Sequence, residues 1–225
     1  MKADDKQLPF SRDYHFIEKK LDDGLSELWL AQPGDVGATS GPFNDWISHK
    51  KKYFEKTKHY RTIITAGGNM GVYVRAYAKI FETVYAFEPS PKNFYCMTYN
   101  TPETNVHHLQ MALGARSGWC TLNTSSKNNS GTHEVAKTGQ GTIPMVTIDQ
   151  FGFEEVDIIQ LDVEGYESQI IKGAMETIKK WWPIIIAERG FDKEVGRELE
   201  LLGYNGMAKS HADVIFVPKY KQNNT

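Results

Sequence analysis

The stretch "TIITAGGNMGVY", residues 62–73, places an apolar run directly before a turn almost free of side chains. The turn contains Gly67, Gly68, Asn69 and Gly71, and an apolar rhythm resumes after it. A strand that leads through a Gly-rich turn into a helix is typical of nucleoside-binding loops. The missing side chains let a ligand approach the main chain, and the helix N-terminus offers free N–H groups. Asn69 suits the turn because asparagine tolerates left-handed backbone angles.

Strand-like and helix-like stretches alternate through the rest of the chain. The apolar runs Ile158–Ile159 and Ile184–Ile186 indicate strands that are buried on both faces. This alternation predicts a three-layer α/β fold with a mostly parallel sheet. Further strands are expected at 83–89, 106–109, 145–148, 156–165, 183–188 and 213–217, with one or two extended pieces in 111–122, and helices at 72–81, 91–100, 166–180 and 192–203.

The residues before this core predict a separate N-terminal extension, residues 1–59, ahead of a single main domain, residues 60–225. Residues 14–31 favour a hairpin that turns at Asp22, Asp23 and Gly24, and residues 43–58 show helical spacing. The basic residues around this helix are interpreted as its solvated face, although they could also meet phosphate on an anionic acceptor. They are Lys50, Lys51, Lys52, Lys56, Lys58 and Arg61, with His49 and His59.

Composition and charge exclude several classes of protein. The 225 residues carry a formal net charge of 26 − 28 = −2, so no overall field favours nucleic acid as a partner. The two cysteines, Cys96 and Cys120, form no disulfide framework or CxxC pair and are expected to be buried thiols. The sequence shows no secretory signal and no membrane-spanning stretch. We therefore expect a cytoplasmic protein.

Glu88 strengthens the interpretation of the glycine loop. It ends the next expected strand, 88 − 67 = 21 positions after Gly67, where an acid can accept hydrogen bonds from ribose hydroxyls. A nicotinamide fingerprint, G-x-G-x-x-G, would also need glycine at positions 69 and 72, which hold Asn69 and Val72. The loop therefore departs from the dinucleotide pattern while keeping the ribose acid.

A second unusual stretch, "IIQLDVEGYE", follows at residues 158–167. Asp162 and Glu164 are two positions apart, so their side chains project to the same side of the strand if the strand extends that far. Ligands bind at the carboxyl ends of strands in such sheets, and two carboxylates there could serve as a general base, a metal pair or a clamp on a cation. Glu167 is expected to cap the helix that follows.

These stretches resemble the FkbM-type methyltransferases, a branch of the S-adenosylmethionine-dependent enzymes. The matching pieces are "GGNMGVY", "VYAFEPSPKNFYCMTYN", "VTIDQF", "VDIIQLDVEGYESQIIKGAMETI" and "WPIIIAE", over roughly residues 60–190. The resemblance implies a Rossmann-like class I methyltransferase fold, a mostly parallel sheet of about seven strands with one antiparallel edge strand and helices on both faces. It also implies that S-adenosyl-L-methionine donates a methyl group, usually to a hydroxyl of a sugar, glycan, lipid or small natural product.

The resemblance assigns roles to individual positions. It places the methionine end of the cofactor over the glycine loop, its ribose at Glu88, its adenine beside Met111, and the transferred methyl near Asp162 and Glu164. The implied cofactor-binding residues are Ala66, Gly67, Gly68, Asn69, Gly71, Glu88, Pro89, Ser90, Met111, Ala112 and Asp162.

Two positions depart from the family pattern. An acid is common where Thr65 stands, and a lysine is common where Gln160 stands. An acid before the loop helps to hold the cofactor's ammonium group or to order the loop. Either another carboxylate, Asp162 being the candidate, replaces it, or cofactor affinity is weakened. We expect binding to survive.

A hydroxyl acceptor needs a base that removes its proton as the new bond forms. The candidate catalytic residues are Asp162, Glu164 and His211, and Glu188 could shape the acceptor pocket. The polar loop at residues 123–142, which includes His133, could fold over the acceptor as a lid. His107 and His108, Tyr95 and Tyr99, and Trp181 and Trp182 are interpreted as structural residues. The spacing defines no metal site, and none is expected.

Two rival interpretations remain open. One is a nicotinamide-dependent oxidoreductase on a related sheet, which the absent glycine disfavours. The other is a binding module that keeps the fold but has lost the chemistry, a reading motivated by Thr65 and Gln160.

Overall fold

The computed structural model describes residues 13–21, 25–33, 50–51, 53–57, 59–124, 133–136, 141–188, 193–210 and 213–221. The expected turn at residues 22–24, the candidate base His211, and much of the expected segments 43–58 and 123–142 lie outside these residues. Among the described helices, none is long and apolar enough to cross a membrane.

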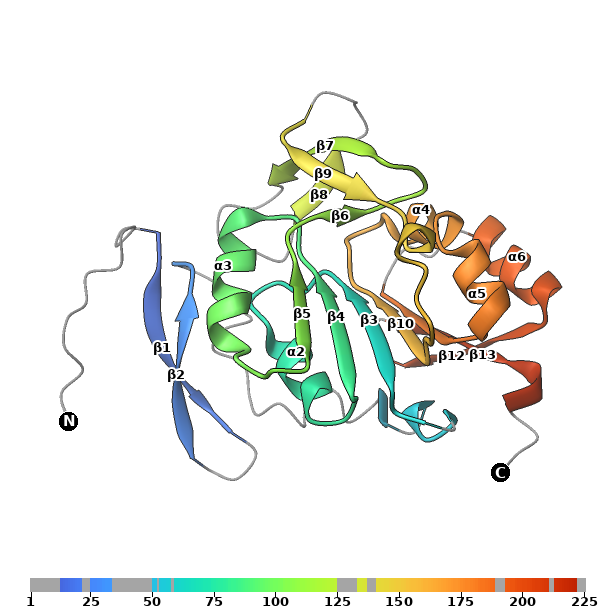
Figure 1. Ribbon diagram of the computed structural model, residues 1–225, viewed down its shortest axis with the longest axis horizontal. Coiled ribbons are helices and arrows are strands. Elements are labelled where there is room, and N and C mark those ends of the chain that lie inside the picture. The colour runs from blue at the N-terminus through green and yellow to red at the C-terminus, as the bar shows by residue number, and fades with distance from the viewer. Residues whose placement is uncertain are drawn as a thin grey trace.

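A seven-stranded sheet forms the centre of the molecule, in the order β12-β13-β11-β10-β3-β4-β5 (Figure 1). All neighbours pair in parallel except at β13, which runs antiparallel to both β11 and β12. The expected mostly parallel sheet with one reversed strand is confirmed, although the reversed strand lies one position inside the edge. The strands are β3 (Thr62–Ala66), β4 (Thr83–Phe87), β5 (Val106–Leu109), β10 (Ile158–Leu161), β11 (Ile184–Ala187), β12 (Tyr204–Ser210) and β13 (Asp213–Pro218).

The edge strand β12 was not predicted from the sequence. Its residues, "YNGMAKS", show little apolar alternation and include Gly206, so local pattern gives no strand signal. Pairing with β13 over most of its length supplies the backbone partners that define it.

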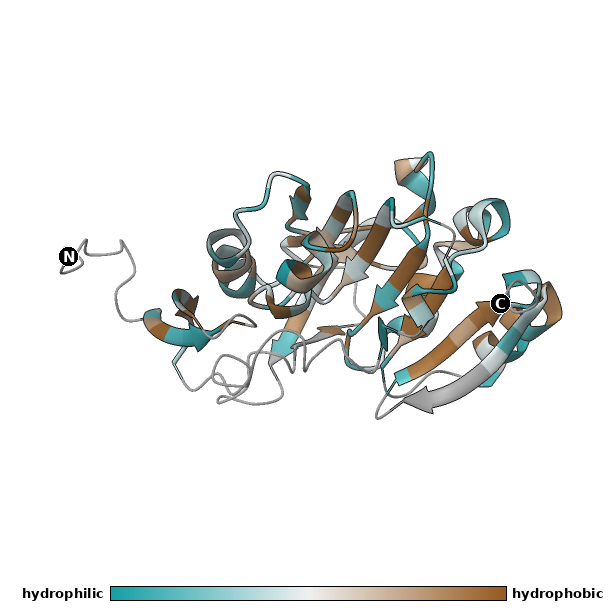
Figure 2. Cartoon of the chain, turned by 90° about the horizontal axis from the view of Figure 1, so that it is seen from below, coloured by the Kyte–Doolittle hydropathy of each residue, from teal (hydrophilic) through white to brown (hydrophobic). Residues whose placement is uncertain are grey.

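Helices cover both faces of the sheet, as expected (Figures 1 and 2). The described helices are α2 (Val72–Ala78), α3 (Pro91–Asn100), α4 (Glu167–Lys172), α5 (Met175–Trp181) and α6 (Lys193–Leu202). The single helix expected at 166–180 is instead two, with the break at Gly173. A Cβ atom on Gly173 would lie 2.0 Å from the carbonyl oxygen of Gly114, so the break lets two backbones touch.

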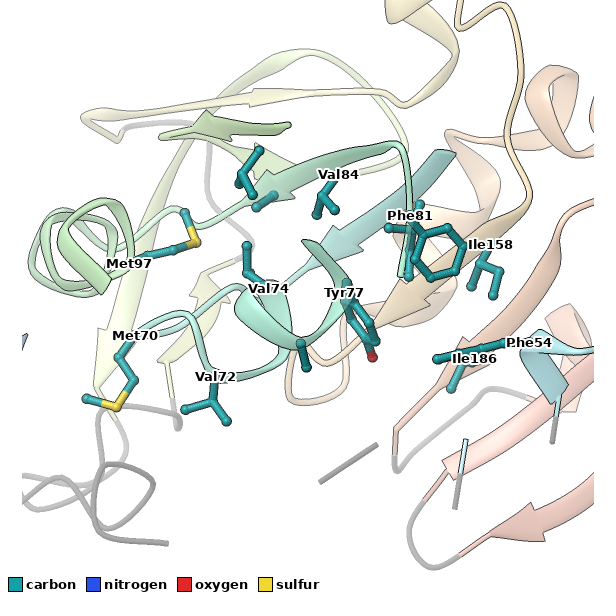
Figure 3. Packing of buried hydrophobic residues seen from close by; sticks show 14 of the residues in the cluster. Phe54, Met70, Val72, Val74, Tyr77, Phe81, Val84, Met97, Ile158 and Ile186 are labelled. Carbon is teal, nitrogen blue, oxygen red and sulfur yellow. The ribbon is translucent and has the colours of Figure 1, made fainter. Parts of the chain in front are cut away.

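Alternate residues of each central strand enter two different cores. Ile63 belongs to the core under α2, and Ile64 to the core under α4, α5 and α6. Figure 3 shows the first core, in which Val74 and Tyr77 of α2 lie over the sheet residues Val84 and Ile158. All of these side chains are fully buried, which confirms the expectation of strands buried on both faces.

The N-terminal hairpin is confirmed as β1 (His15–Lys20) paired antiparallel with β2 (Ser26–Ala31). It packs on α3, where Tyr14 contacts Tyr95 and Phe16 contacts Tyr99, with ring centroids 5.1 and 5.6 Å apart. The Asn100 side chain accepts the Leu30 N–H and donates to the carbonyls of Leu30 and Met70. Asn100 therefore connects the hairpin, through Leu30, with the glycine loop, through Met70.

A second, four-stranded sheet follows β5 and lies beyond its carboxyl end (Figure 1). Its strands are β6 (Ala112–Leu113), β7 (Gly118–Thr124), β8 (His133–Ala136) and β9 (Ile143–Val146). The prediction of an unbroken polar loop at 123–142 was wrong, because β8 pairs with β7 inside that segment. β8 forms because it pairs with β7, and the polar composition of a segment does not reveal such pairing.

Candidate active site

The topology brings four strand ends together. From β3 the chain proceeds through β4 to β5 on one side, and later through β10 to β11 on the other. The order therefore reverses between β3 and β10, and ligands of such sheets bind at this point, outside the carboxyl ends of the strands. Here these ends deliver the glycine loop, Glu88, Asp162 and Glu188.

The glycine loop adopts the left-handed angles that its sequence predicts, with φ of 84° at Gly67, 46° at Asn69 and 101° at Gly71. Close packing is a second reason why this loop carries glycines. A Cβ atom on Gly67 would lie 1.8 Å from the carbonyl oxygen of Asp162, and one on Gly68 would lie 2.3 Å from the Met97 sulfur. Gly67 must therefore be glycine to fit against the backbone of its own protein.

Glu88 joins the loops that follow β3 and β4. Its Oε2 accepts the N–H of Asn69 at 2.7 Å, and its Oε1 accepts the N–H of Ser90 at 2.8 Å. The side chain is 4% exposed. Burial raises the pKa of Glu88 to about 7, although hydrogen bonds from Ser90, Asn69 and Asn93 oppose the shift. Three donors thus use three of the four lone pairs of the carboxylate, and one is left for a hydroxyl.

Asp162 and Glu188 stand directly after β10 and β11, two neighbouring parallel strands, so their carboxyl groups lie near each other. Their backbones extend the sheet by one bond each, from the Asp162 N–H to Ala66 and from the Glu188 N–H to Leu161. Burial, followed by the hydrogen bond and charge of Glu188, raises the pKa of Asp162 well above its usual range.

Glu164 does not lie where strand alternation would put it. The strand ends at Leu161, and Glu164 occupies a turn with a left-handed φ of 52° and an exposed side chain. Its charge still raises the pKa of Asp162. Glu167 opens α4, and its carboxylate accepts the Gly165 N–H at 3.3 Å, which agrees with the capping role expected for it.

Lys50 is buried, contrary to the sequence interpretation. It was placed on a solvated face, but it is 1% exposed. Its Nζ lies 3.3 Å from Oδ2 of Asp213 and 4.2 Å from the ring centroid of Tyr73. A signal was present, because Lys50 stands three and four residues before Tyr53 and Phe54, which are buried on the same helix face. Asp213 and Tyr73 were also missed.

The two departures from the family pattern face each other. Thr65 and Gln160 are direct partners on β3 and β10, both are buried, and the Thr65 hydroxyl donates to Gln160 Oε1 at 2.5 Å. Nε2 of Gln160 has no hydrogen-bond partner among the described residues. A neutral pair thus occupies positions where the family commonly carries two opposite charges.

The other expected cofactor residues lie around this centre. Pro89 and Ser90 follow Glu88, and Ser90 precedes α3, whose first residue is proline. Met111 is partly buried directly after β5, and Ala112 is buried at the start of β6.

His107 and His108 make contacts that suit structural residues. His107 stacks on Tyr85 with ring centroids 4.8 Å apart, and His108 Nε2 lies 2.6 Å from the Thr101 hydroxyl, which agrees with structural roles.

Within the part of the chain that the structure describes, no three His, Cys, Asp or Glu side chains are grouped to hold a metal ion.

The sheet order, the reversed β13 and the loop after β3 define a Rossmann-like class I methyltransferase fold. The T. thermophilus 16S rRNA N2 G1207 methyltransferase RsmC, solved with AdoMet and guanosine, has a similar fold. The TM-score is 0.52 with 11% identity, over 92% of this chain and 50% of that chain. A Methylobacillus flagellatus KT FkbM methyltransferase aligns with 13% identity and a TM-score of 0.45, over 73% of this chain and 49% of that one.

Residues 67–215 match the family model "Methyltransferase FkbM domain", and the chain belongs to this family. It is 28% identical to the hexuronic acid methyltransferase AglP of Haloferax volcanii over 119 residues. That match covers 50% of this chain and 49% of the relative, so the chain spans about half of the relative's length.

Proposed function

We propose that this protein is an S-adenosyl-L-methionine-dependent methyltransferase that methylates a hydroxyl oxygen of a sugar or glycan. The observation that carries the proposal is the convergence of Glu88 and the Asp162–Glu188 pair beside the glycine loop, in a chain of the FkbM methyltransferase family. We assign the chemistry to residues 60–225 and treat residues 1–59 as an extension.

The residues present suit this cofactor. Glu88 is an acceptor with a lone pair available for a ribose hydroxyl. Asp162 and Glu188 follow neighbouring strands, and Lys50, the one cation that shifts the pKa of Asp162 among the described residues, is already paired with Asp213. This excess of acidic groups suits a cation. When bound, S-adenosylmethionine supplies a methyl group activated by the positive sulfonium.

The chain's own residues then bind the acceptor and take its proton. Asp162 is the proposed general base, because burial and the neighbouring Glu188 raise its pKa and so strengthen it as a proton acceptor. Glu164 lies on an exposed turn and is better placed at the rim of the site. His211 lies outside the described residues and remains a sequence-based candidate.

The acceptor class rests on similarity to a hexuronic acid methyltransferase, and on the absence of the charge that nucleic acid would require. We expect specificity to depend on the regions outside the sheet, residues 1–59 and 123–142.

Cofactor binding is tested by thermal shift with S-adenosylmethionine, S-adenosylhomocysteine and NAD, because a ligand that binds only the folded state stabilises it. We expect the first two to raise the melting temperature and NAD to have no effect. Glu88→Ala should remove most of the shift, whereas Glu55→Gln, at an exposed position, should keep it. Stabilisation by NAD alone would support the oxidoreductase instead.

Radiolabelled methyl transfer to uronic acid, neutral sugar and lipid-linked acceptors then separates an enzyme from a binding module. The neutral Thr65–Gln160 pair is the observation that favours a binding module without catalytic activity as the alternative. Cofactor binding with no transfer to any of these acceptors would favour it.

A further inference from the structure

Two backbone groups of β2 point away from β1 and bind the side chain of Asn100, at the end of α3. Among the described strands, β2 pairs with β1 alone, so alternate N–H and C=O groups of β2 face outward. The Leu30 N–H donates to Asn100 Oδ1 at 2.8 Å, and Asn100 Nδ2 donates to the Leu30 carbonyl at 2.9 Å. The Asn100 side chain therefore takes the place of a further strand beside Leu30.

The same side chain holds the glycine loop. Asn100 Nδ2 also donates to the carbonyl of Met70 at 2.9 Å, and Met70 lies on the loop just before α2 (Figure 3). This carbonyl precedes the helical ladder, because the first intrahelical bond runs from the Arg75 N–H to the Gly71 carbonyl. Met70 and Asn100 are each 2% exposed, so the carbonyl needs a partner from the protein, and Asn100 supplies it.

Further contacts fix this end of α3 relative to the loop and to β2. Arg75 of α2 donates to the Asn100 carbonyl at 2.7 Å, and its Nη2 lies 3.0 Å from Oε2 of Glu27 on β2. A Cβ atom on Gly71 would lie 2.7 Å from Cγ2 of Thr101, so the loop touches the end of the helix directly. The strand β2, both helices and the glycine loop thus meet around Asn100.

A second hydrogen bond attaches the end of β2 to the first turn of α3. Gln32, which follows β2, donates through Nε2 to Oδ1 of Asn93. Asn93 is the third residue of α3 and is buried, and Ser90, just before this helix, donates its N–H to Glu88. Although the segment from Leu30 to Gln32 precedes the family-matched region, residues 67–215, it is therefore attached to α3 at two points.

We propose that Asn100 is a positioning residue for the cofactor. It holds the glycine loop against β2, and this makes the N-terminal hairpin part of the cofactor-binding site. Asn100 touches no ligand in this arrangement and acts through the Met70 carbonyl. The inference rests on the proposed function, in which the loop receives the methionine end of S-adenosylmethionine. A ligand on the loop and the docking of β2 on α3 should then stabilise each other, since coupling between two sites is reciprocal.

The test compares two ligands that share an adenosine and differ at the methionine end. S-Adenosylhomocysteine carries the amino acid that the loop should receive, and 5′-methylthioadenosine lacks it. Calorimetry on the full chain gives the dissociation constant of each. In Asn100→Ala, we expect the affinity for S-adenosylhomocysteine to fall about tenfold, which corresponds to about one hydrogen bond. The affinity for 5′-methylthioadenosine should stay within about twofold of the wild type.

Asn105→Ala is the matched control. Asn105 Nδ2 also donates to two backbone carbonyls, those of Ala78 at 2.9 Å and Phe81 at 2.8 Å, but these lie at the end of α2 opposite to the loop. This variant should lose stability in urea as Asn100→Ala does, and it should bind both ligands as the wild type does. The proposal is overturned if Asn100→Ala weakens both ligands equally or neither, or if the control shows the same selective loss. Asn100 would then only support the fold.

Hydrogen exchange in the wild type decides the case if Asn100→Ala does not fold. The Leu30 N–H donates to Asn100, so its exchange reports the opening of this contact. At equal saturation, S-adenosylhomocysteine should slow this exchange about tenfold more than 5′-methylthioadenosine does, because the coupling is reciprocal. Equal slowing by the two ligands, or none, would contradict the proposal. A wild type that binds neither ligand would instead refute the proposed function, on which this inference rests.

Discussion

Replacing Glu88 by glutamine should change how the stability of this protein depends on pH. Burial raises the pKa of Glu88 from its usual 4.5 to about 7, so the folded protein holds this proton more tightly than the unfolded chain. Stability from this proton is complete below pH 4.5 and is lost as the pH rises to about 7. At about 1.4 kcal/mol per pKa unit, the loss amounts to about 3 kcal/mol.

The assay is urea unfolding of the wild type and Glu88→Gln at intervals between about pH 4.5 and about pH 7.5. Glutamine stays neutral throughout, so the free energy of unfolding of the wild type should fall by about 3 kcal/mol relative to the variant across this window. The difference between the two proteins isolates Glu88 from Asp162, which titrates in both. Glu55→Gln, at an exposed position, should follow the wild type.

Parallel curves for the wild type and Glu88→Gln would refute the reasoning, because they would mean that burial does not shift this proton. A ligand adds an independent check. Ribose hydroxyls that donate to Glu88 favour its charged form, so cofactor affinity should rise with pH up to about 7 in the wild type. This rise should be smaller in Glu88→Gln.

Three further predictions concern the site and its frame. Gly67→Ala should cost about 3 kcal/mol or more in urea unfolding, because it combines left-handed strain with backbone overlap. Gly165→Ala, which has a φ of 94° but no atom near the added carbon, should cost only about 1 kcal/mol. Thr65→Asp and Gln160→Lys should each cost about 3 kcal/mol alone and much less together, and a double-mutant cycle that gave simple additivity would count against their pairing. Asp149→Ala should cost about 1 to 2 kcal/mol, since this carboxylate caps the start of α5, and should leave the cofactor-induced thermal shift unchanged.

The local sequence predicted those features that depend on neighbours in the chain. Apolar runs such as Ile184–Ile186 indicated buried strands, and the glycine loop indicated a strand-to-helix turn with left-handed angles. The position of Glu88 at a strand end followed from the same pattern. In each case the cause is local, either side-chain periodicity or backbone freedom.

The features that sequence reasoning missed depend on contacts between distant segments. The edge strand β12 exists through its pairing with β13, and β8 exists through its pairing with β7. Gly173 divides an expected helix because its backbone meets Gly114 from another part of the chain.

The sequence by itself determined the α/β frame, the glycine loop and the acids at the strand ends, because these follow from periodicity and position. Only the tertiary structure decided that Lys50 is buried against Asp213, that Glu188 lies beside Asp162 and raises its pKa, and that Thr65 and Gln160 are partners across β3 and β10. The physical reason is that burial and charge pairing are set by what the fold brings within a few ångströms. The number of residues between two positions in the chain does not reveal how close the fold brings their side chains.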